Sequence, residues 1–144
     1  MAEQTTSSVT VAASKADIMG VIADFESYPQ WAEAVRETEV LETASGGQPV
    51  RVRFKLDTGV LKDEYVLGYQ WDDDNAVRWR LVEEGSVLSG MRGAYLLSER
   101  ADSTEVTYEL AVDVKIPMIG MFKRKAEKVI IDTALRELKK RVEG

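Results

Sequence analysis

Apolar and polar residues alternate with a period of two through most of the middle of the chain, as they do in half-buried β-strands. The clearest case is residues 50–57, where apolar side chains alternate with arginine, lysine and aspartate. Segments rich in glycine, serine, asparagine and aspartate separate these runs, which is typical of turns. The pattern predicts a first strand that ends at Val9-Thr10-Val11 and six more over residues 35–41, 50–57, 61–69, 77–81, 91–97 and 105–114.

Two short helices are predicted between the first and second strands. Ser14 stands three residues before Asp17, a spacing that resembles a capping box and predicts a helix through about Asp24. Pro29 is favoured in a first helical turn, so a break is expected directly before it. Trp31 is then expected to open a second short helix.

A long amphipathic helix is predicted at the C-terminal end, from the positions that share a face at about 100° per residue. One apolar face comprises Ile119, Phe122, Ala126, Val129, Ile130 and Thr133. A second apolar edge comprises Ile131, Leu135, Leu138 and Val142. Burial on two sides fits a helix held between a curled sheet and the two short helices.

This order of elements predicts an α+β helix-grip fold, in which an antiparallel sheet curls around the last helix. No linker, repeat or low-complexity tract interrupts the chain, so residues 1–144 are predicted to form a single domain. Folds of this type enclose a cavity between sheet and helix. An exposed edge strand permits a dimer as well as a monomer, and nothing in the sequence requires either.

Thr58-Gly59 predicts a tight two-residue hairpin, which fixes the register of the strands on either side. In that register Phe54 faces Asp63, and Val52 faces Tyr65. Asp63 then stands as a carboxylate in an otherwise apolar inner row. It is interpreted either as a side chain near a hairpin end that is solvated or paired with a neighbouring basic residue, or as a polar group at the mouth of a cavity.

Composition limits the chemistry that the chain can perform. The 144 residues are 44% hydrophobic and 31% charged, as expected for a soluble globular protein. The absence of cysteine excludes disulfides, thiolate nucleophiles and soft-metal sites, and the absence of histidine removes the commonest general base and metal ligand. The N-terminal residues lack the features of a signal peptide, and no apolar segment is long enough to span a bilayer. A cytoplasmic location is expected.

Neither a metal site nor a cofactor is expected. A calcium-binding loop that began at Asp72 would fail at its fifth position, Ala76, and at Val77, where glycine is needed. The three aspartates that begin there are therefore interpreted as a solvated turn. The glycines between Gly85 and Gly93 match neither a phosphate-binding loop nor a nucleophile elbow.

The net charge of −6 argues against nonspecific binding to nucleic acid, but it hides an asymmetry. Residues 1–114 carry 10 basic and 21 acidic groups, whereas residues 115–144 carry 9 basic and 4 acidic groups. Within the segment from Ile116 to Lys125, apolar residues stand directly before three cations. This segment is interpreted either as core followed by a solvated face, or as a mobile entrance with weak contact to an anionic membrane.

The octapeptide Asp24-Phe25-Glu26-Ser27-Tyr28-Pro29-Gln30-Trp31 contains the pattern Asp-x-x-x-Tyr-Pro-x-Trp. This pattern and the order of elements from Val9 to Val142 resemble the polyketide cyclase/dehydrase and lipid-transport family, a branch of the START-related (SRPBCC) helix-grip superfamily. The resemblance implies a seven-stranded antiparallel sheet around the C-terminal helix, with a hydrophobic cavity between them. Members range from aromatase/cyclases that act on acyl-carrier-bound polyketides to carriers of sterols, lipids and quinones.

The expected function is noncatalytic binding or transport of a small hydrophobic molecule in that cavity. Aromatic and methionine side chains supply apolar area there, while tyrosine hydroxyls and one carboxylate fix orientation. Each of these side chains is equally compatible with plain core packing. The residues expected to contact the ligand are Phe54, Asp63, Tyr65, Trp79, Met91, Tyr95, Met118 and Phe122.

Two other functions remain open at this point. The first is an aromatase/cyclase or dehydratase acting on a polyketide intermediate, with acid–base work by Asp63, Tyr65, Tyr95 or Arg92. Arg51, Arg53, Arg78 and Arg80 have the alternation of outward residues, whereas the direction of Arg92 is not fixed by the pattern. The second is a protein whose basic last helix docks on a membrane or partner, with a vestigial cavity.

Overall fold

The structure, a computed structural model, describes residues 4–57, 62–115 and 120–144, the last range with side chains from residue 123 onward. One antiparallel sheet has the strand order β1-β7-β6-β5-β4-β3-β2. Its strands are β1 (Thr5–Val11), β2 (Val35–Thr43), β3 (Pro49–Asp57), β4 (Lys62–Asp72), β5 (Ala76–Glu83), β6 (Leu88–Glu99) and β7 (Thr104–Val114). The helices are α1 (Lys15–Ala23), the 3-10 turn η1 (Phe25–Ser27), α2 (Tyr28–Trp31) and α3 (Gly120–Glu143).

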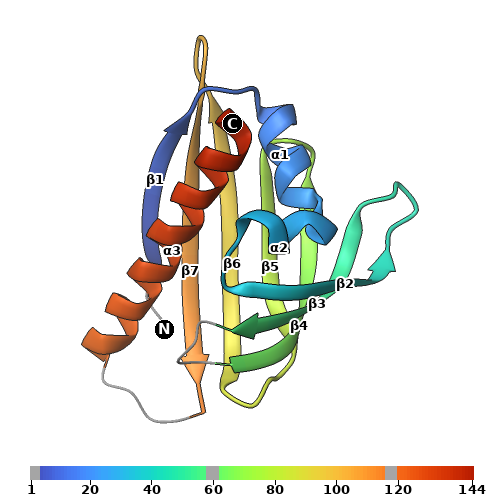
Figure 1. Ribbon diagram of the computed structural model, residues 1–144, viewed down its shortest axis with the longest axis vertical. Coiled ribbons are helices and arrows are strands. Elements are labelled where there is room, and N and C mark those ends of the chain that lie inside the picture. Colours follow the sequence, from blue (N-terminus) through green and yellow to red (C-terminus); the bar gives the residue numbers. More distant parts are fainter. Residues whose placement is uncertain (1–3, 58–61, 116–119) are drawn as a thin grey trace.

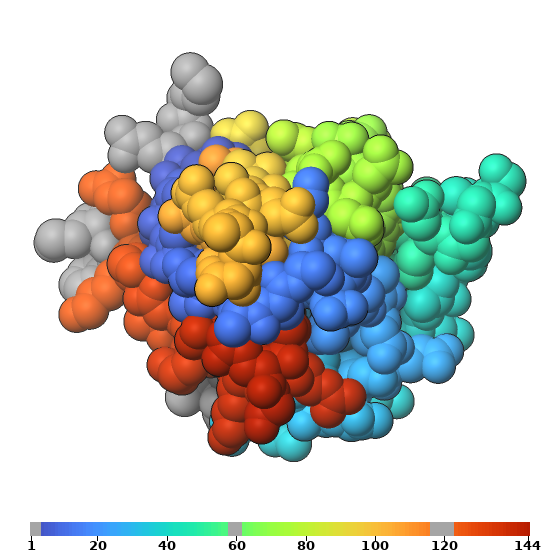
Figure 2. Space-filling model, turned by 90° about the horizontal axis from the view of Figure 1, so that it is seen from above, coloured from blue at the N-terminus to red at the C-terminus, as the bar shows by residue number. Residues whose placement is uncertain are grey.

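This arrangement confirms the predicted α+β helix-grip fold. Figure 1 shows the sheet curling so that β2, β3 and β4 turn across the direction of β5, β6 and β7. Helix α3 crosses the concave side of the sheet in front of β1 and β7, and α1 and α2 cover the same side further along. Seen from above in Figure 2, the red C-terminal turns of α3 lie against the blue N-terminal helices.

Local capping sets the start of α1, and Pro29 sets the position of α2. The Asp17 amide donates to Ser14 Oγ at 3.2 Å, which confirms the predicted helix start. Pro29 lies in the first turn of α2, as expected because proline has no backbone N–H and the N–H groups of a first turn have no intrahelical acceptor. The prediction that Trp31 opens this helix is wrong, because the helix already begins at Tyr28 and Trp31 is its last residue.

The predicted register between β3 and β4 is wrong by two residues. Phe54 pairs with Tyr65, and Asp57 pairs with Lys62, so four residues separate the last described pair rather than two. The predicted turn at Thr58-Gly59 itself lies outside the described residues. A slip of two keeps every side chain on the same face of a strand, so the predicted inner row survives the error.

Helix α3 is buried along its second apolar edge rather than its first. Ile131, Leu135 and Leu138 are buried, whereas Val129 and Ile130 are 60% and 45% exposed. Ala126 is also exposed, while Ile119 and the Phe122 side chain lie outside the described residues. The prediction that the first face is buried is therefore wrong for Ala126, Val129 and Ile130.

The buried side of α3 includes a carboxylate, and that explains which face turns inward. Glu127 accepts a hydrogen bond from the Val112 amide and another from Thr5 Oγ1, both at 2.7 Å. Strand β1 is paired with β7 only as far as Leu110, so the Val112 amide needs an acceptor from elsewhere. A periodicity argument places a glutamate in water and thus favours the wrong arc.

The end of α3 also covers the free edge of β1. Lys139 Nζ donates to the Thr10 carbonyl at 2.6 Å, and the Ala12 amide donates to Glu143 Oε2 at 2.9 Å. Side chains of the helix therefore contact backbone groups at the end of β1 and in the residue that follows it. Among the described residues, no helix has the length and apolarity needed to cross a bilayer.

Candidate functional site: an aromatic interior

The concave face of the sheet is lined by a continuous group of aromatic rings. The two-residue alternation turns every second side chain of each strand toward the concave face. Tyr95 and Tyr108 lie 4.7 Å apart between ring centroids, and each lies 5.4 Å from Trp79. The group as a whole comprises Phe54 on β3, Tyr65 and Tyr69 on β4, Trp79 on β5, Tyr95 on β6 and Tyr108 on β7.

The octapeptide after α1 closes one end of this group. Phe25 is 1% exposed, and its ring lies 4.9 Å from that of Tyr69. Tyr28 Oη donates to the Ile22 carbonyl at 2.5 Å, which ties the start of α2 to the end of α1. The pattern that the sequence singled out is therefore a structural clamp that brings three more aromatic rings to the interior.

Burial raises the pKa of all five tyrosine hydroxyls above the usual value near 10. The main cause is removal from water, which disfavours the charged phenolate. Neighbouring hydroxyls add to the effect, as for Tyr69, whose ionisation is opposed by Tyr28 and Tyr65. The hydroxyls are therefore neutral groups at physiological pH, able to donate and to accept a hydrogen bond.

The described part of the interior contains no basic side chain. Its buried polar residues are Asp63, Thr104 and Glu127, and all three make hydrogen bonds within the fold. The arginines predicted to face outward are exposed, and so is Arg92, whose direction the sequence left open. No described residue could therefore supply a buried cation for a ligand carboxylate, and no group of described side chains is arranged to hold a metal ion.

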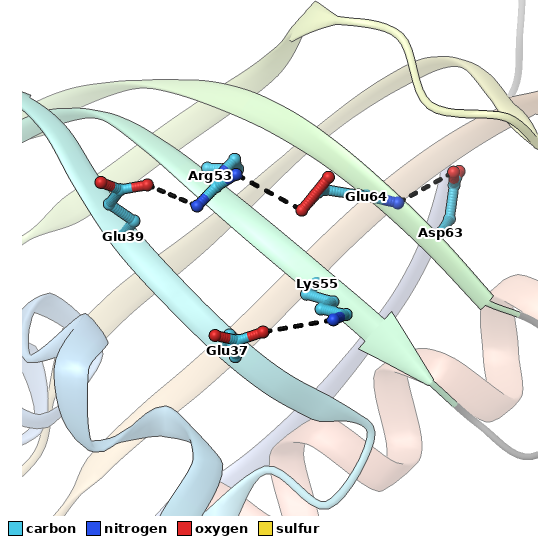
Figure 3. A network of polar contacts seen from close by, with 6 residues as sticks. All are labelled: Glu37, Glu39, Arg53, Lys55, Asp63 and Glu64. Carbon is cyan, nitrogen blue, oxygen red and sulfur yellow. Dashed lines mark hydrogen bonds and ion pairs between the residues drawn. The ribbon is translucent and has the colours of Figure 1, made fainter.

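Asp63 is buried, with both carboxylate oxygens engaged by backbone amides. Oδ1 accepts from the amides of Glu64 at 2.9 Å and Ser86 at 2.6 Å. Oδ2 accepts from Val87 at 3.3 Å and Leu88 at 2.9 Å. Figure 3 shows Asp63 beside Glu64, turned to the opposite side of β4 from the exposed ion pairs. The carboxylate thus holds the β5–β6 connection against β4.

Gly85 explains how the connection comes so close to this carboxylate. A Cβ at Gly85 would lie only 2.2 Å from Asp63 Oδ1, so any larger residue would push the two apart. The interpretation of Asp63 as solvated or paired with a basic residue is wrong, because its partners are backbone amides. The role of Asp63 in orienting a ligand stays a prediction.

The other predicted ligand contacts fall into two groups. Phe54, Tyr65, Trp79 and Tyr95 are brought together in the aromatic interior, and Met91 packs half-buried against them. Met118 and the side chain of Phe122 lie outside the described residues. Sequence reasoning left out Tyr69 and Tyr108, although both share the alternation of the chosen tyrosines and could have been found by it.

Trp31 carries the one buried side-chain nitrogen or oxygen that has no hydrogen-bond partner within the described part of the chain. Its indole ring lies 4.9 Å from the Tyr28 ring. By contrast, Trp71 Nε1 donates to the Pro49 carbonyl at 2.6 Å. Buried polar groups are nearly always paired, so an unpaired indole N–H beside a tyrosine-lined interior marks a position where a bound molecule could accept.

The curled sheet, the enclosed last helix and the aromatic interior define a START-type helix-grip domain. A sequence profile for "polyketide cyclase / dehydrase and lipid transport" proteins matches residues 2–143. The chain therefore belongs to this family. No curated protein sequence matches it significantly.

Solved structures with the same fold differ widely in sequence. A START superfamily protein from Mycobacterium smegmatis superposes with a TM-score of 0.90 at 24% identity, covering 97% of both chains. The ZhuI aromatase/cyclase from a Streptomyces species gives 0.78 at 16% identity, covering 99% of this chain and 94% of that one. A protein from Thermus thermophilus gives 0.80 at 20% identity over 97% of both. At these identities the likeness establishes the fold alone.

Proposed function

We propose that the protein binds a small, neutral, hydrophobic molecule within its aromatic interior and carries or senses it without changing it. The observation that supports this most directly is the composition of that interior. It offers rings for apolar contact and protonated hydroxyls for orientation, and the described residues add no cation that would favour an anionic ligand.

The inner tyrosines are buried but keep a small accessible surface. Tyr65 and Tyr95 each retain 7% of their surface and Tyr108 retains 8%, whereas Ile18 and Val77 retain none. The inner tyrosines therefore keep slightly more accessible surface than these two aliphatic side chains.

Binding is tested with ligands that differ in one group. We expect 2-acetonaphthone and hexadecanol to bind with one site per chain, and at least about tenfold more tightly than 2-naphthoate and hexadecanoate at neutral pH. A buried carboxylate without a cation must be desolvated or protonated, and a tenfold difference needs only about 1.4 kcal/mol. Tryptophan fluorescence and native mass spectrometry report affinity and stoichiometry. Nonsaturable binding of every ligand, or equal binding of the carboxylates, would contradict the proposal.

The Trp31→Phe variant tests whether the unpaired indole N–H contacts the ligand. The variant should lower the affinity for 2-acetonaphthone about fivefold, because about 1 kcal/mol is typical of one hydrogen bond. Its affinity for 2-ethylnaphthalene, which has no hydrogen-bond acceptor, should not change. Trp71→Phe is the matched control, because it removes an N–H that is already bonded to Pro49. Trp71→Phe should lower the free energy of unfolding by about 1 kcal/mol and leave the affinity for 2-acetonaphthone unchanged. Equal affinities in Trp31→Phe and wild type would remove Trp31 from the site.

The alternative function is an aromatase/cyclase or dehydratase acting on a polyketide intermediate. Tyr65 and Tyr95 would supply hydroxyls beside the ligand, but their raised pKa makes them poor general bases near neutral pH. Carriage therefore has more support than catalysis. Incubation with a linear polyketone, followed by mass spectrometry and NMR of the recovered ligand, separates the two. A carrier returns the ligand unchanged, whereas a cyclase returns a ring isomer of the same mass and a dehydratase lowers the mass by one water.

A second proposal concerns the first half of α3 as a membrane contact. Val129 and Ile130 are exposed, and they share this half of the helix with the exposed cations Arg124 and Lys125. We expect weak cosedimentation with anionic liposomes at low salt, reduced in Val129→Ser/Ile130→Ser and absent from neutral liposomes. Lys139→Ala is the control, because its cation contacts β1 instead. Equal binding to both kinds of liposome would contradict the proposal.

A further inference from the structure

The face of the sheet turned away from α3 carries a groove that is separate from the aromatic interior. It has a volume of about 560 Å³ and runs over the backbone of β3, β4 and β5. Most side chains at its surface are polar. The lining residues that project from this face include Glu42, Arg51, Gln70, Arg78, Arg80 and Val82.

Arg51 and Arg80 lie in one row across the strands at this groove, and Arg92 continues the row on β6 beyond the lining residues. The strand registers place Arg51 opposite Gly68, Gly68 opposite Arg80, and Arg80 opposite Arg92. Because neighbouring strands are about 4.8 Å apart, Arg51 and Arg80 flank Gly68 at about 10 Å from each other. Arg78 stands two residues from Arg80 on the same face. Long guanidinium side chains from both sides can therefore reach the space above the glycine.

Gly68 gives the groove floor its shape. A Cβ at this position would lie 2.8 Å from Val82 Cγ2, closer than side chains approach one another. Val82 is brought over the glycine by a register shift between β4 and β5, where Leu67 pairs with Leu81 and Val66 with Glu83. The floor is thus bare backbone with one apolar wall, between two cationic sides.

Two of the cations that line the groove, Arg78 and Arg80, lack the carboxylate partners that neutralise the neighbouring part of the same face. Figure 3 shows Arg53 between Glu39 and Glu64, and Lys55 beside Glu37. In the groove, the lining carboxylate is Glu42, whose Oε1 is 3.9 Å from Arg51 Nε.

Arg78 and Arg80 form no ion pair or side-chain hydrogen bond with any residue in the described ranges. A cluster of this kind in a chain with a net charge of −6 is therefore not explained by stability.

We propose that this groove binds the phosphate group of a small soluble phosphate monoester. A tetrahedral dianion presents three oxygens, so it can accept from guanidiniums on both sides of Gly68 at once, and planar guanidinium groups suit it better than a lysine would. The volume lies within the usual range for small-molecule sites, which leaves room for the esterified group against Val82. The lining residues form a recess rather than a flat surface, which favours a small soluble ligand over a membrane.

The experiment titrates inorganic phosphate, ribose 5-phosphate and ribose into the protein, with heteronuclear NMR of the arginine Nε–Hε and backbone signals as readout. We expect saturable shifts at Arg51, Arg78, Arg80 and Gly68 with both phosphates and none with ribose. Arg80→Gln should lower the affinity for ribose 5-phosphate at least about fivefold, and the double variant Arg78→Gln/Arg80→Gln should abolish saturable binding. Arg53→Gln, on the same face but already paired with Glu39, should change the affinity less than about twofold.

Three results would overturn the proposal. Sodium chloride at matched ionic strength could reproduce the shifts, the double variant could retain full affinity, or binding could be confined to vesicles that contain phosphatidic acid. The arginine variants are exposed and should keep the wild-type unfolding curve, which shows that lost binding is not lost folding. They should also bind 2-acetonaphthone normally, so this groove and the aromatic interior succeed or fail separately.

Discussion

Raising the pH above about 10 is expected to unfold the protein cooperatively, with its tyrosines ionising only as the fold is lost. All five tyrosines have a raised pKa in the folded state, mainly because they are buried. Below the unfolded pKa near 10 both states keep their protons and stability is constant. Above it the unfolded chain releases protons that the native state retains, so the free energy of unfolding falls.

The expected slope is about 1.4 kcal/mol per pH unit for each tyrosine, or about 7 for all five, against a typical total stability of 5–15 kcal/mol. Between about pH 6 and 8 the stability should be nearly flat, because the chain has no histidine. Tyrosinate absorbance and circular dichroism should change together in an alkaline titration. Tyr108→Phe should reduce the slope by one tyrosine's share. Ionisation of several tyrosines near pH 10 with circular dichroism intact would contradict this expectation.

Replacing Asp63 with alanine should lower the free energy of unfolding by about 3–5 kcal/mol. The change removes the acceptor of four backbone amides, and each buried donor left without a partner costs about 1–3 kcal/mol, reduced by whatever water enters. Urea unfolding measures the difference. Glu64→Ala, the adjacent exposed residue with an ion pair to Arg53 at 3.4 Å, should change stability by less than about 1 kcal/mol.

The same variants separate the two roles considered for Asp63. If the carboxylate only holds the β5–β6 connection, Asp63→Asn should retain ligand affinity under conditions where the variant is fully folded. A loss of affinity without loss of folded protein would assign Asp63 to the ligand as well. A stability change below about 1 kcal/mol in Asp63→Ala would show that the four amides find other partners easily.

The sequence predicted the faces of the strands better than their pairings. Alternation alone turned Phe54, Tyr65, Trp79 and Tyr95 toward the interior, and the structure brings these four rings together. The β3–β4 register depended instead on one turn and was displaced by two residues. Since side chains return to the same face every second residue, the inner row was insensitive to that error.

The same error hid the row of arginines on the outer face. The predicted register would have set Arg51 opposite Val66, whereas the observed one sets it opposite Gly68. A cross-strand row depends on the register of every strand pair it crosses, so alternation within single strands cannot reveal it. The sequence did predict that Arg51, Arg78 and Arg80 face outward, and that part is confirmed.

Helix α3 shows why hydrophobicity alone could not choose between two apolar arcs. Val129 and Ile130 are as apolar as Ile131 and Leu135, yet they lie on the exposed side. The choice follows from a polar contact, because Glu127 supplies an acceptor to the Val112 amide beyond the end of β1. Such a contact depends on where another strand stops, and a local sequence pattern carries no record of that.

The pairing of β1 with β7 has a consequence for how the chain is made. The two strands are roughly a hundred residues apart, and β1 has no other neighbour in the described sheet. At typical rates of about 5–20 residues per second, β1 leaves the ribosome roughly 5–20 s before its partner exists. Hairpins from β2 onward can form as they emerge, while the first strand waits unpaired. Among the described strands, β1 is therefore the one that stays unpaired longest during synthesis.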